Sequence, residues 1–126
     1  MLGAVVKPEG LIADEKAENF DIIVFIGGSG SAALWDNTDA HKIAKEALDN
    51  DKVVTAICLA PVILARAGVL ANCQATVFKS ARNELEKVGV QCIDKPVVRC
   101  GKVITGNGPS AVQEFTEAIM SIFQKK

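Results

Sequence analysis

One cysteine lies where a buried strand is expected to turn directly into a helix. Residues 53–57 (VVTAI) are apolar or β-branched without polar alternation, a pattern typical of a strand covered on both faces in a parallel sheet. Pro61 fits the first turn of a helix that ends at Gly68. Cys58 would present its sulfur at the carboxyl edge of the sheet, where the helix dipole predicts a lowered thiol pKa and a nucleophilic role. The alternative is a cysteine that only packs in the core.

A glycine-rich loop follows a second buried strand. Residues 21–26 (DIIVFI) predict the strand, and Gly27, Gly28 and Ser29 come directly after it. Backbone N–H groups in such a loop can hold an anion or an oxyanion. The loop lacks the pattern of a phosphate-binding or dinucleotide-binding motif, so the alternative is a glycine cluster without a ligand.

The two loops are expected to meet at one edge of a parallel sheet. A helix capped by Asn37 or Thr38 runs to about residue 50 and joins the two strands into a β-α-β unit. Open α/β sheets place their sites outside the carboxyl ends of such strands. His41 falls in the first turn of this helix, and we expect it to be a surface residue.

The second half of the chain predicts further strands and two helices. Strands are expected at 75–78, 90–93, 97–99 and 102–105, the last two forming a hairpin. Ser80 would cap a short helix over 81–88, and Ser110 with Gln113 forms a capping box that opens the last helix.

Composition narrows the class of protein. The 126 residues fit one domain, and 14 basic against 15 acidic residues give a net charge of −1, which does not favour binding to nucleic acid or to an anionic membrane. No apolar run is long enough to span a bilayer, and no signal peptide is evident, so a cytoplasmic location is expected.

The cysteines and the histidine give no metal-site pattern. The four cysteines have no C-x-x-C spacing and the one histidine has no cysteine at ligand spacing, so neither a metal site nor a cofactor is expected. The cysteines are expected to be thiols, with Cys73–Cys92 or Cys92–Cys100 as less favoured disulfide alternatives.

Three segments together resemble a known family. DIIVFIGGSG, TAICLAPVILARAGVL and KVITGNGPSAVQEFTEAI occur in the order and approximate spacing of the ThiJ/PfpI family, within the class I glutamine-amidotransferase-like superfamily. The resemblance implies a flavodoxin-like α/β/α sandwich with a mostly parallel sheet. It also implies a catalytic Cys58, an oxyanion hole from the backbone N–H groups of Gly28 and Leu59, and assembly into dimers or larger rings. We expect Gly27, Ser29, Asn107, Gly108 and Pro109 to line the pocket.

Two departures from the family pattern affect these expectations. Members carry an additional amino-terminal β-α-β part with a glutamate that hydrogen-bonds the cysteine sulfur, so residues 1–126 resemble a single incomplete domain. We expect this chain to pair with that segment or with another copy, because a sheet edge without a partner must be covered. Leu59 and Phe78 also occupy the regions where family members place a histidine, which leaves the cysteine without a general base there.

The sequence therefore leaves two functions open. In the first, Cys58 attacks a small carbonyl, glycated or amide substrate, as in a deglycase, a glyoxalase or a peptidase. In the second, the protein is a non-catalytic stress sensor or chaperone-like oligomer in which Cys58 is a redox-sensitive thiol.

Overall fold

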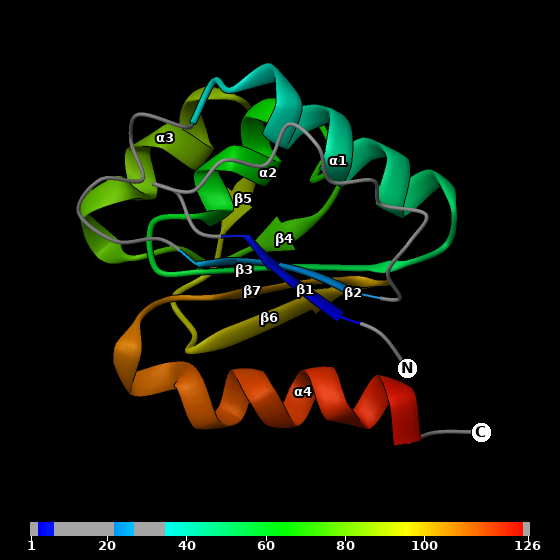
Figure 1. The fold of residues 1–126 in the computed structure, drawn as a ribbon. Helices are drawn as coiled ribbons and strands as arrows, with labels where there is room; N and C mark the ends of the chain where they lie inside the picture. Colours follow the sequence, from blue (N-terminus) through cyan, green and yellow to red (C-terminus); the bar gives the residue numbers. More distant parts are fainter. Residues whose placement is uncertain (1–2, 7–21, 27–34, 125–126) are drawn as a thin grey trace.

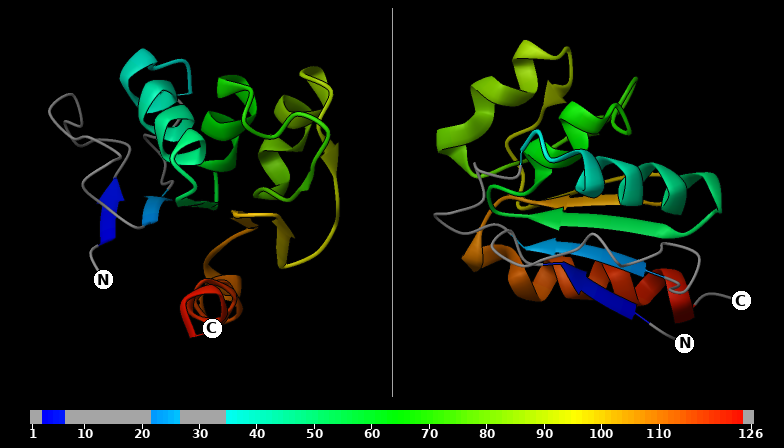
Figure 2. Two further views of the ribbon diagram at one scale, coloured as in Figure 1. Left: turned by 90° about the vertical axis from the view of Figure 1, so that its right-hand side faces the viewer. Right: turned by 45° about the horizontal axis from the view of Figure 1, so that its top comes forward.

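Helices cover both faces of one central sheet. A computed structural model of the chain describes residues 3–6, 22–26 and 35–124. In the view of Figure 1, α1, α2 and α3 lie above the sheet and α4 lies below it, an arrangement that Figure 2 shows from two further directions. This is the α/β sandwich predicted from the sequence. None of the helices in the described ranges combines the length and the hydrophobicity that a membrane span requires.

The sheet has the order β1-β2-β3-β7-β6. All neighbouring pairs are parallel except β6 and β7, which form the predicted antiparallel hairpin. Its strands are β1 (Gly3–Val6), β2 (Ile22–Ile26), β3 (Val53–Ile57), β6 (Val97–Cys100) and β7 (Val103–Gly106). The two predicted buried strands, β2 and β3, are adjacent, and Ile26 pairs with Ile57 at the last register position of both.

The helices between and after these strands begin and end close to the predicted residues. In α1 (Thr38–Asp49), the Asn37 side chain accepts a hydrogen bond from the Ala40 N–H at 2.9 Å, which selects Asn37 over Thr38 as the cap. α2 (Pro61–Ala67) starts at the predicted proline and ends at Gly68, whose φ of 83° is the left-handed conformation typical of a helix end.

The segment after α2 is less regular than predicted. β4 (Gln74–Ala75) pairs with β5 (Gln91–Cys92) in a separate two-stranded parallel sheet, and residues 76–78 are not strand. The backbone N–H groups of Thr76 and Phe78 instead donate to Thr105 Oγ1 and to the Cys58 carbonyl. Hydrogen bonds across the molecule therefore replace the ladder that the β-branched sequence suggested.

Both serine caps predicted in the second half are wrong. Ser80 lies inside a 3₁₀ turn (Lys79–Ala81) before α3 (Arg82–Lys87), and neither element has a side-chain cap. Ser110 lies inside a second 3₁₀ turn (Pro109–Ala111) that leads into α4 (Val112–Gln124). In both places a tight turn precedes the helix and moves its start beyond the serine.

Among the described side chains, the core has two parts, one on each face of the sheet. The larger cluster packs α1, α2 and α3 on one face, and the smaller one packs Phe115 of α4 against Ile57 and Ile104 on the other. One buried polar side chain, Thr55, is satisfied by donating to the Ile23 carbonyl at 3.0 Å.

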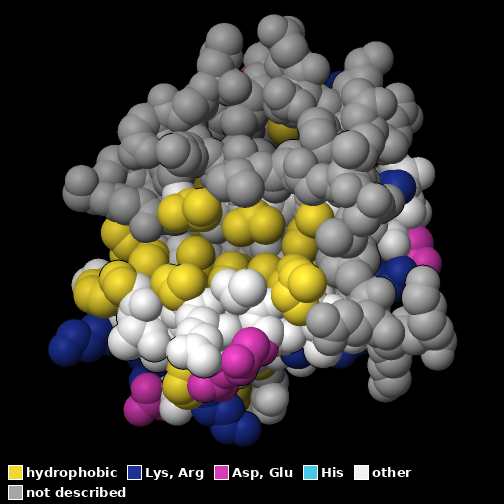
Figure 3. Space-filling model, turned by 60° about the horizontal axis from the view of Figure 1, so that its bottom comes forward, with side chains coloured by type: hydrophobic (Ala, Val, Ile, Leu, Met, Phe, Trp, Pro, Cys, Tyr) yellow, Lys and Arg dark blue, Asp and Glu magenta, His cyan; other side chains and the backbone are white. Residues whose placement is uncertain are grey.

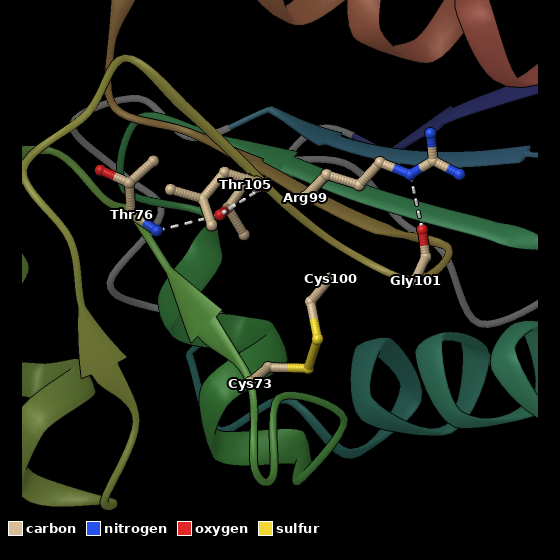
Figure 4. Close-up of a disulfide and its surroundings, with 7 residues drawn as sticks. Cys73, Thr76, Arg99, Cys100, Gly101 and Thr105 are labelled. Atoms are coloured by element: carbon tan, nitrogen blue, oxygen red, sulfur yellow. Dashed lines mark hydrogen bonds between the residues drawn. A yellow bond between two sulfur atoms is a disulfide. The ribbon is translucent and has the colours of Figure 1, made fainter.

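Cys73 and Cys100 form a disulfide, so the expectation that all four cysteines are thiols is wrong. The pairing also differs from the two alternatives considered from sequence, since Cys92 is free. The bond joins the loop after α2 to the end of β6 (Figure 4). Because the two cysteines lie 27 residues apart, one in a loop and the other at the end of β6, sequence spacing alone gave no indication of their contact.

Candidate functional site

Cys58 occupies the sharp turn between β3 and α2, and its backbone is in an unusual conformation. Its φ is 65°, a left-handed value that residues with a side chain rarely adopt. Two hydrogen bonds hold it there: the Cys58 N–H donates to the Gly106 carbonyl at 3.0 Å, and the Phe78 N–H donates to the Cys58 carbonyl at 2.8 Å. Strain of this kind costs about 1–3 kcal/mol and persists only where the surroundings impose it, often at functional sites.

The environment of the Cys58 sulfur differs from the sequence-based expectation. The side chain is half-buried against the cluster of Ile57, Ile104 and Phe115. Burial raises the pKa of the Cys58 thiol above its ordinary value, because an apolar environment disfavours the thiolate. The lowered pKa expected from the helix dipole is therefore not found in the described structure, where α2 is only seven residues long.

Leu59, the predicted oxyanion donor, directly follows Cys58 in the turn. Its carbonyl accepts hydrogen bonds from the Trp35 indole N–H at 3.3 Å and from the Val62 N–H at 3.4 Å. Within the described ranges, the Leu59 N–H has no acceptor. It is thus a backbone donor adjacent to Cys58 without an acceptor among these residues.

Sequence analysis missed Trp35, which contacts this turn, and the bond that joins His41 to Trp35. His41 Nε2 lies 2.7 Å from the Trp35 carbonyl and donates to it, while the Trp35 indole reaches Leu59. His41 is half-buried rather than a free surface residue, but its ring is committed to Trp35. The one signal in the sequence was the position of the chain's only tryptophan, shortly after the glycine-rich loop.

The loop after β7 lies at the same sheet edge as Cys58. Gly108 is buried, and a Cβ atom at this position would lie 3.3 Å from the Phe78 ring, so Phe78 covers Gly108 beside the turn. Asn107 is half-buried and donates its N–H to the Pro96 carbonyl, whereas Pro109 is exposed. Phe78 is itself 38% exposed and adds an aromatic surface that sequence analysis had not assigned to the site.

The remaining predicted site residues, Gly27, Gly28 and Ser29, lie outside the described residues. Metal ligands were not expected, and in the described part of the chain no group of three or more histidine, cysteine, aspartate or glutamate side chains could hold a metal ion. The described site thus brings together, at one sheet edge, a thiol, an aromatic side chain and a backbone N–H that has no acceptor within the described residues.

Replacing Gly106 with alanine tests how tightly side chains pack around Gly106, whose carbonyl accepts the hydrogen bond from the Cys58 N–H. A Cβ atom at Gly106 would meet side-chain atoms of Ile57 and Phe115, each at 3.0 Å. We expect Gly106→Ala to lower the free energy of unfolding by about 1–3 kcal/mol in urea titration. Adding Ile57→Val, which removes the Cδ1 contact at 3.1 Å, should restore part of the loss. Wild-type stability in Gly106→Ala would contradict this packing.

Arg66 connects Trp35 to the helical layer. Its guanidinium lies 5.3 Å from the Trp35 ring centroid and donates to Asp36 and Glu84, both at 2.6 Å. A surface pocket of about 390 Å³ next to this network does not include Cys58. The hydrogen-bonded ion pair with Arg66 lowers the pKa of Glu84 most, and the pair with Lys87 lowers it further.

The lowered pKa of Glu84 predicts a pH effect on stability. Because the folded-state pKa lies below the unfolded value of about 4.3, the contribution is present above that pH and is lost as the pH falls through the folded-state pKa. Arg66→Gln should therefore weaken the decline in unfolding midpoint on acidification below about pH 5. Lys42→Gln, which removes an exposed pair with Glu46 elsewhere, is the matched control. An unchanged acid slope in Arg66→Gln would contradict the prediction.

The family assignment comes from comparison with known proteins. The model of the DJ-1/PfpI family matches residues 1–122. The chain belongs to the DJ-1/PfpI family. This confirms the resemblance to the ThiJ/PfpI group seen in the sequence.

Three curated relatives illustrate the range of this family. An uncharacterised protein of Methanocaldococcus jannaschii is 40% identical over 99% of this chain and 62% of its own length. The glutathione-independent glyoxalase DJR-1.2 of Caenorhabditis elegans is 28% identical over 97% of this chain and 65% of its length. The deglycase PfpI of Pyrococcus furiosus is 31% identical over 97% of this chain and 74% of its length. The chain thus spans under two thirds of the first two relatives.

A solved structure shows the same fold. The ThiJ/PfpI domain protein from Brachyspira murdochii superposes with a TM-score of 0.87 at 30% identity, over 92% of this chain and 67% of that chain. The mostly parallel sheet and its flanking helices are therefore the DJ-1/PfpI flavodoxin-like fold.

Proposed function

We propose that this DJ-1/PfpI protein uses Cys58 as the nucleophile toward the carbonyl group of a small aldehyde or glycated substrate. The observation that carries the proposal is the left-handed Cys58, whose neighbour Leu59 offers a backbone N–H without an acceptor in the described ranges. The glyoxalase and deglycase names of two relatives support this class of substrate. Amide hydrolysis is less favoured, because it needs an acid for the leaving group and the one histidine of the chain is bonded to Trp35.

The proposed step is addition of the sulfur to the carbonyl carbon. A bond forms between Cys58 Sγ and that carbon, and the π electrons of the carbonyl move to its oxygen. The Leu59 N–H would donate to this oxyanion, together with the Gly28 N–H predicted from sequence. The thiol proton passes to solvent as the bond forms, and a proton from solvent then neutralises the oxygen. The product of this step is a hemithioacetal on Cys58.

The raised pKa of Cys58 predicts how this thiol reacts with pH. The thiolate is the reacting form, so the rate of alkylation by iodoacetamide should keep rising through and above about pH 8.5, the ordinary thiol value. Peptide mass mapping of Cys58 in a Cys92→Ser background measures this rate at one site. A plateau reached already near pH 7 would contradict the direction of the shift.

A second candidate is a non-catalytic redox-sensitive thiol. The observation in its favour is that His41, the one histidine of the chain, is bonded to Trp35 and so does not supply a general base to Cys58. This candidate predicts peroxide-dependent sulfenic acid at Cys58 without turnover of methylglyoxal. Steady consumption of methylglyoxal by the purified chain favours the first candidate, and peroxide-sensitive labelling without consumption favours the second.

We also propose that the protein works as a homo-oligomer or paired with a further polypeptide segment. Hydrophobic side chains form a band on the sheet face beside α4 (Figure 3). Ile26 at the end of β2 is 38% exposed, and Val24 on the same strand is half-buried. Light scattering of the purified chain tests the homo-oligomer, since a monomer at all concentrations would leave only pairing with another segment.

A further inference from the structure

We propose that Cys73 and Cys100 are a reversible thiol-modification site that controls how firmly the Cys58 turn is held. The inference concerns regulation of the site assigned above and takes its functional meaning from that proposal. Its structural basis is a set of connections between the disulfide and the two hydrogen bonds at Cys58. These connections are present whether or not Cys58 reacts with a carbonyl.

The disulfide joins the two segments that impose the conformation of Cys58. The first segment, residues 73–78, ends at Phe78, whose N–H donates to the Cys58 carbonyl. The second segment runs from Cys100 through the hairpin to Gly106, whose carbonyl accepts the Cys58 N–H. Each segment therefore begins at one of the bonded cysteines and ends at one side of the strained residue.

A further hydrogen bond joins the two segments between these ends. The Thr76 N–H donates to Thr105 Oγ1 at 2.9 Å, and both groups are buried (Figure 4). The disulfide and this hydrogen bond are thus two cross-links between the segments, and both precede the residues that hydrogen-bond to Cys58. Loss of the covalent link leaves residues 73–78 attached to the hairpin through hydrogen bonds and packing alone. We therefore expect the backbone between Cys73 and Phe78 to open more often.

The disulfide lies where a small reductant can reach it. Cys73 and Cys100 are half-buried, and their neighbours Asn72 and Gly101 are exposed. Both neighbours are in turns with positive φ, 63° and 62°. Because the bond is only half-buried, it should be reduced more readily than a fully buried structural disulfide, and disulfides that can be reached in this way are more often regulatory.

The modifying reagent is a small dithiol. Its thiolate attacks one of the two protein sulfurs, the Cys73–Cys100 bond breaks, and a mixed disulfide forms while the released sulfur takes up a proton. The second thiol of the reagent then displaces the protein sulfur. The reagent leaves as a cyclic disulfide, oxidised by two electrons, and both cysteines are left as thiols.

Amide hydrogen exchange of the folded chain before and after treatment with dithiothreitol tests the proposal. We expect the disulfide to be reduced without denaturant, and exchange at the Thr76, Phe78 and Cys58 amides to accelerate by about tenfold or more. The amides of Ile43 and Ala44 in the middle of α1 should exchange only through global unfolding, so their rates should stay dependent on low concentrations of urea, whereas exchange at Thr76, Phe78 and Cys58 should become largely independent of urea. A disulfide that opens only on unfolding would overturn the proposal.

A double variant separates loss of the Cys73–Cys100 bond from general loosening of the fold. Cys73→Ser/Cys100→Ser should reproduce the exchange pattern of the reduced protein, and Cys92→Ser, which removes a free cysteine, should resemble the oxidised protein. Exchange at Phe78 that keeps the urea dependence of the α1 amides would show that residues 73–78 open only by global unfolding, and would overturn the proposal. If the double variant does not fold, the reduced wild-type chain gives the same comparison. The readout is independent of Cys58 chemistry, so an inactive thiol together with exchange that depends on the disulfide would refute only the proposed function.

Discussion

Replacing Cys58 with serine should reduce methylglyoxal consumption by the chain by about 10³-fold or more, the scale of loss seen when a covalent nucleophile is removed. Serine keeps the shape of the side chain, but its hydroxyl is a much weaker nucleophile than a thiol without an adjacent base. Steady-state consumption, followed by the loss of the aldehyde, measures the effect.

Cys92→Ser is the matched control for this experiment. Cys92 is likewise free and half-buried, and burial is the largest cause raising the pKa of its thiol too. It lies in β5, outside the Cys58 turn. We expect Cys92→Ser to retain wild-type consumption. Equal losses in both variants would indicate a general effect of free thiols and contradict the assignment of Cys58.

The second large effect concerns stability. Removing the Cys73–Cys100 disulfide should lower the free energy of unfolding by about 3–4 kcal/mol, because the bond closes a loop between residues 27 positions apart. Urea titration of Cys73→Ser/Cys100→Ser against wild type under non-reducing conditions measures the loss. Cys92→Ser again serves as the control. A loss below about 1 kcal/mol would mean that the bond adds little constraint to the unfolded chain.

The sheet was predictable from sequence because its central strands are strongly patterned. β3 has the predicted bounds, and β2 differs from its prediction by one residue. Their apolar runs match strands that are covered on both faces. Asn37, Pro61 and Gly68 fixed the ends of α1 and α2, because each residue has a specific local preference at a helix end.

The features that were predicted wrongly or missed from the sequence depend on tertiary contacts. Thr76 is β-branched, yet its N–H donates to Thr105 in the main sheet rather than continuing β4. The Cys73–Cys100 pair and the Trp35–Leu59 contact join segments distant in the sequence. The pKa of Cys58 is raised because Ile57, Ile104 and Phe115 surround it, and the packing of Phe115 could not be inferred from the strand-to-helix turn alone.

The most direct test of the nucleophilic role is protection of Cys58 by a carbonyl compound. The chain is incubated with increasing methylglyoxal and briefly alkylated with iodoacetamide, and labelling is measured separately at Cys58 and Cys92 by peptide mass mapping. If the Cys58 turn stabilises the hemithioacetal, Cys58 will be protected at concentrations about tenfold lower than Cys92, the effect of about 1.4 kcal/mol of additional stabilisation. Equal protection of the two thiols, or none at Cys58, would contradict the account.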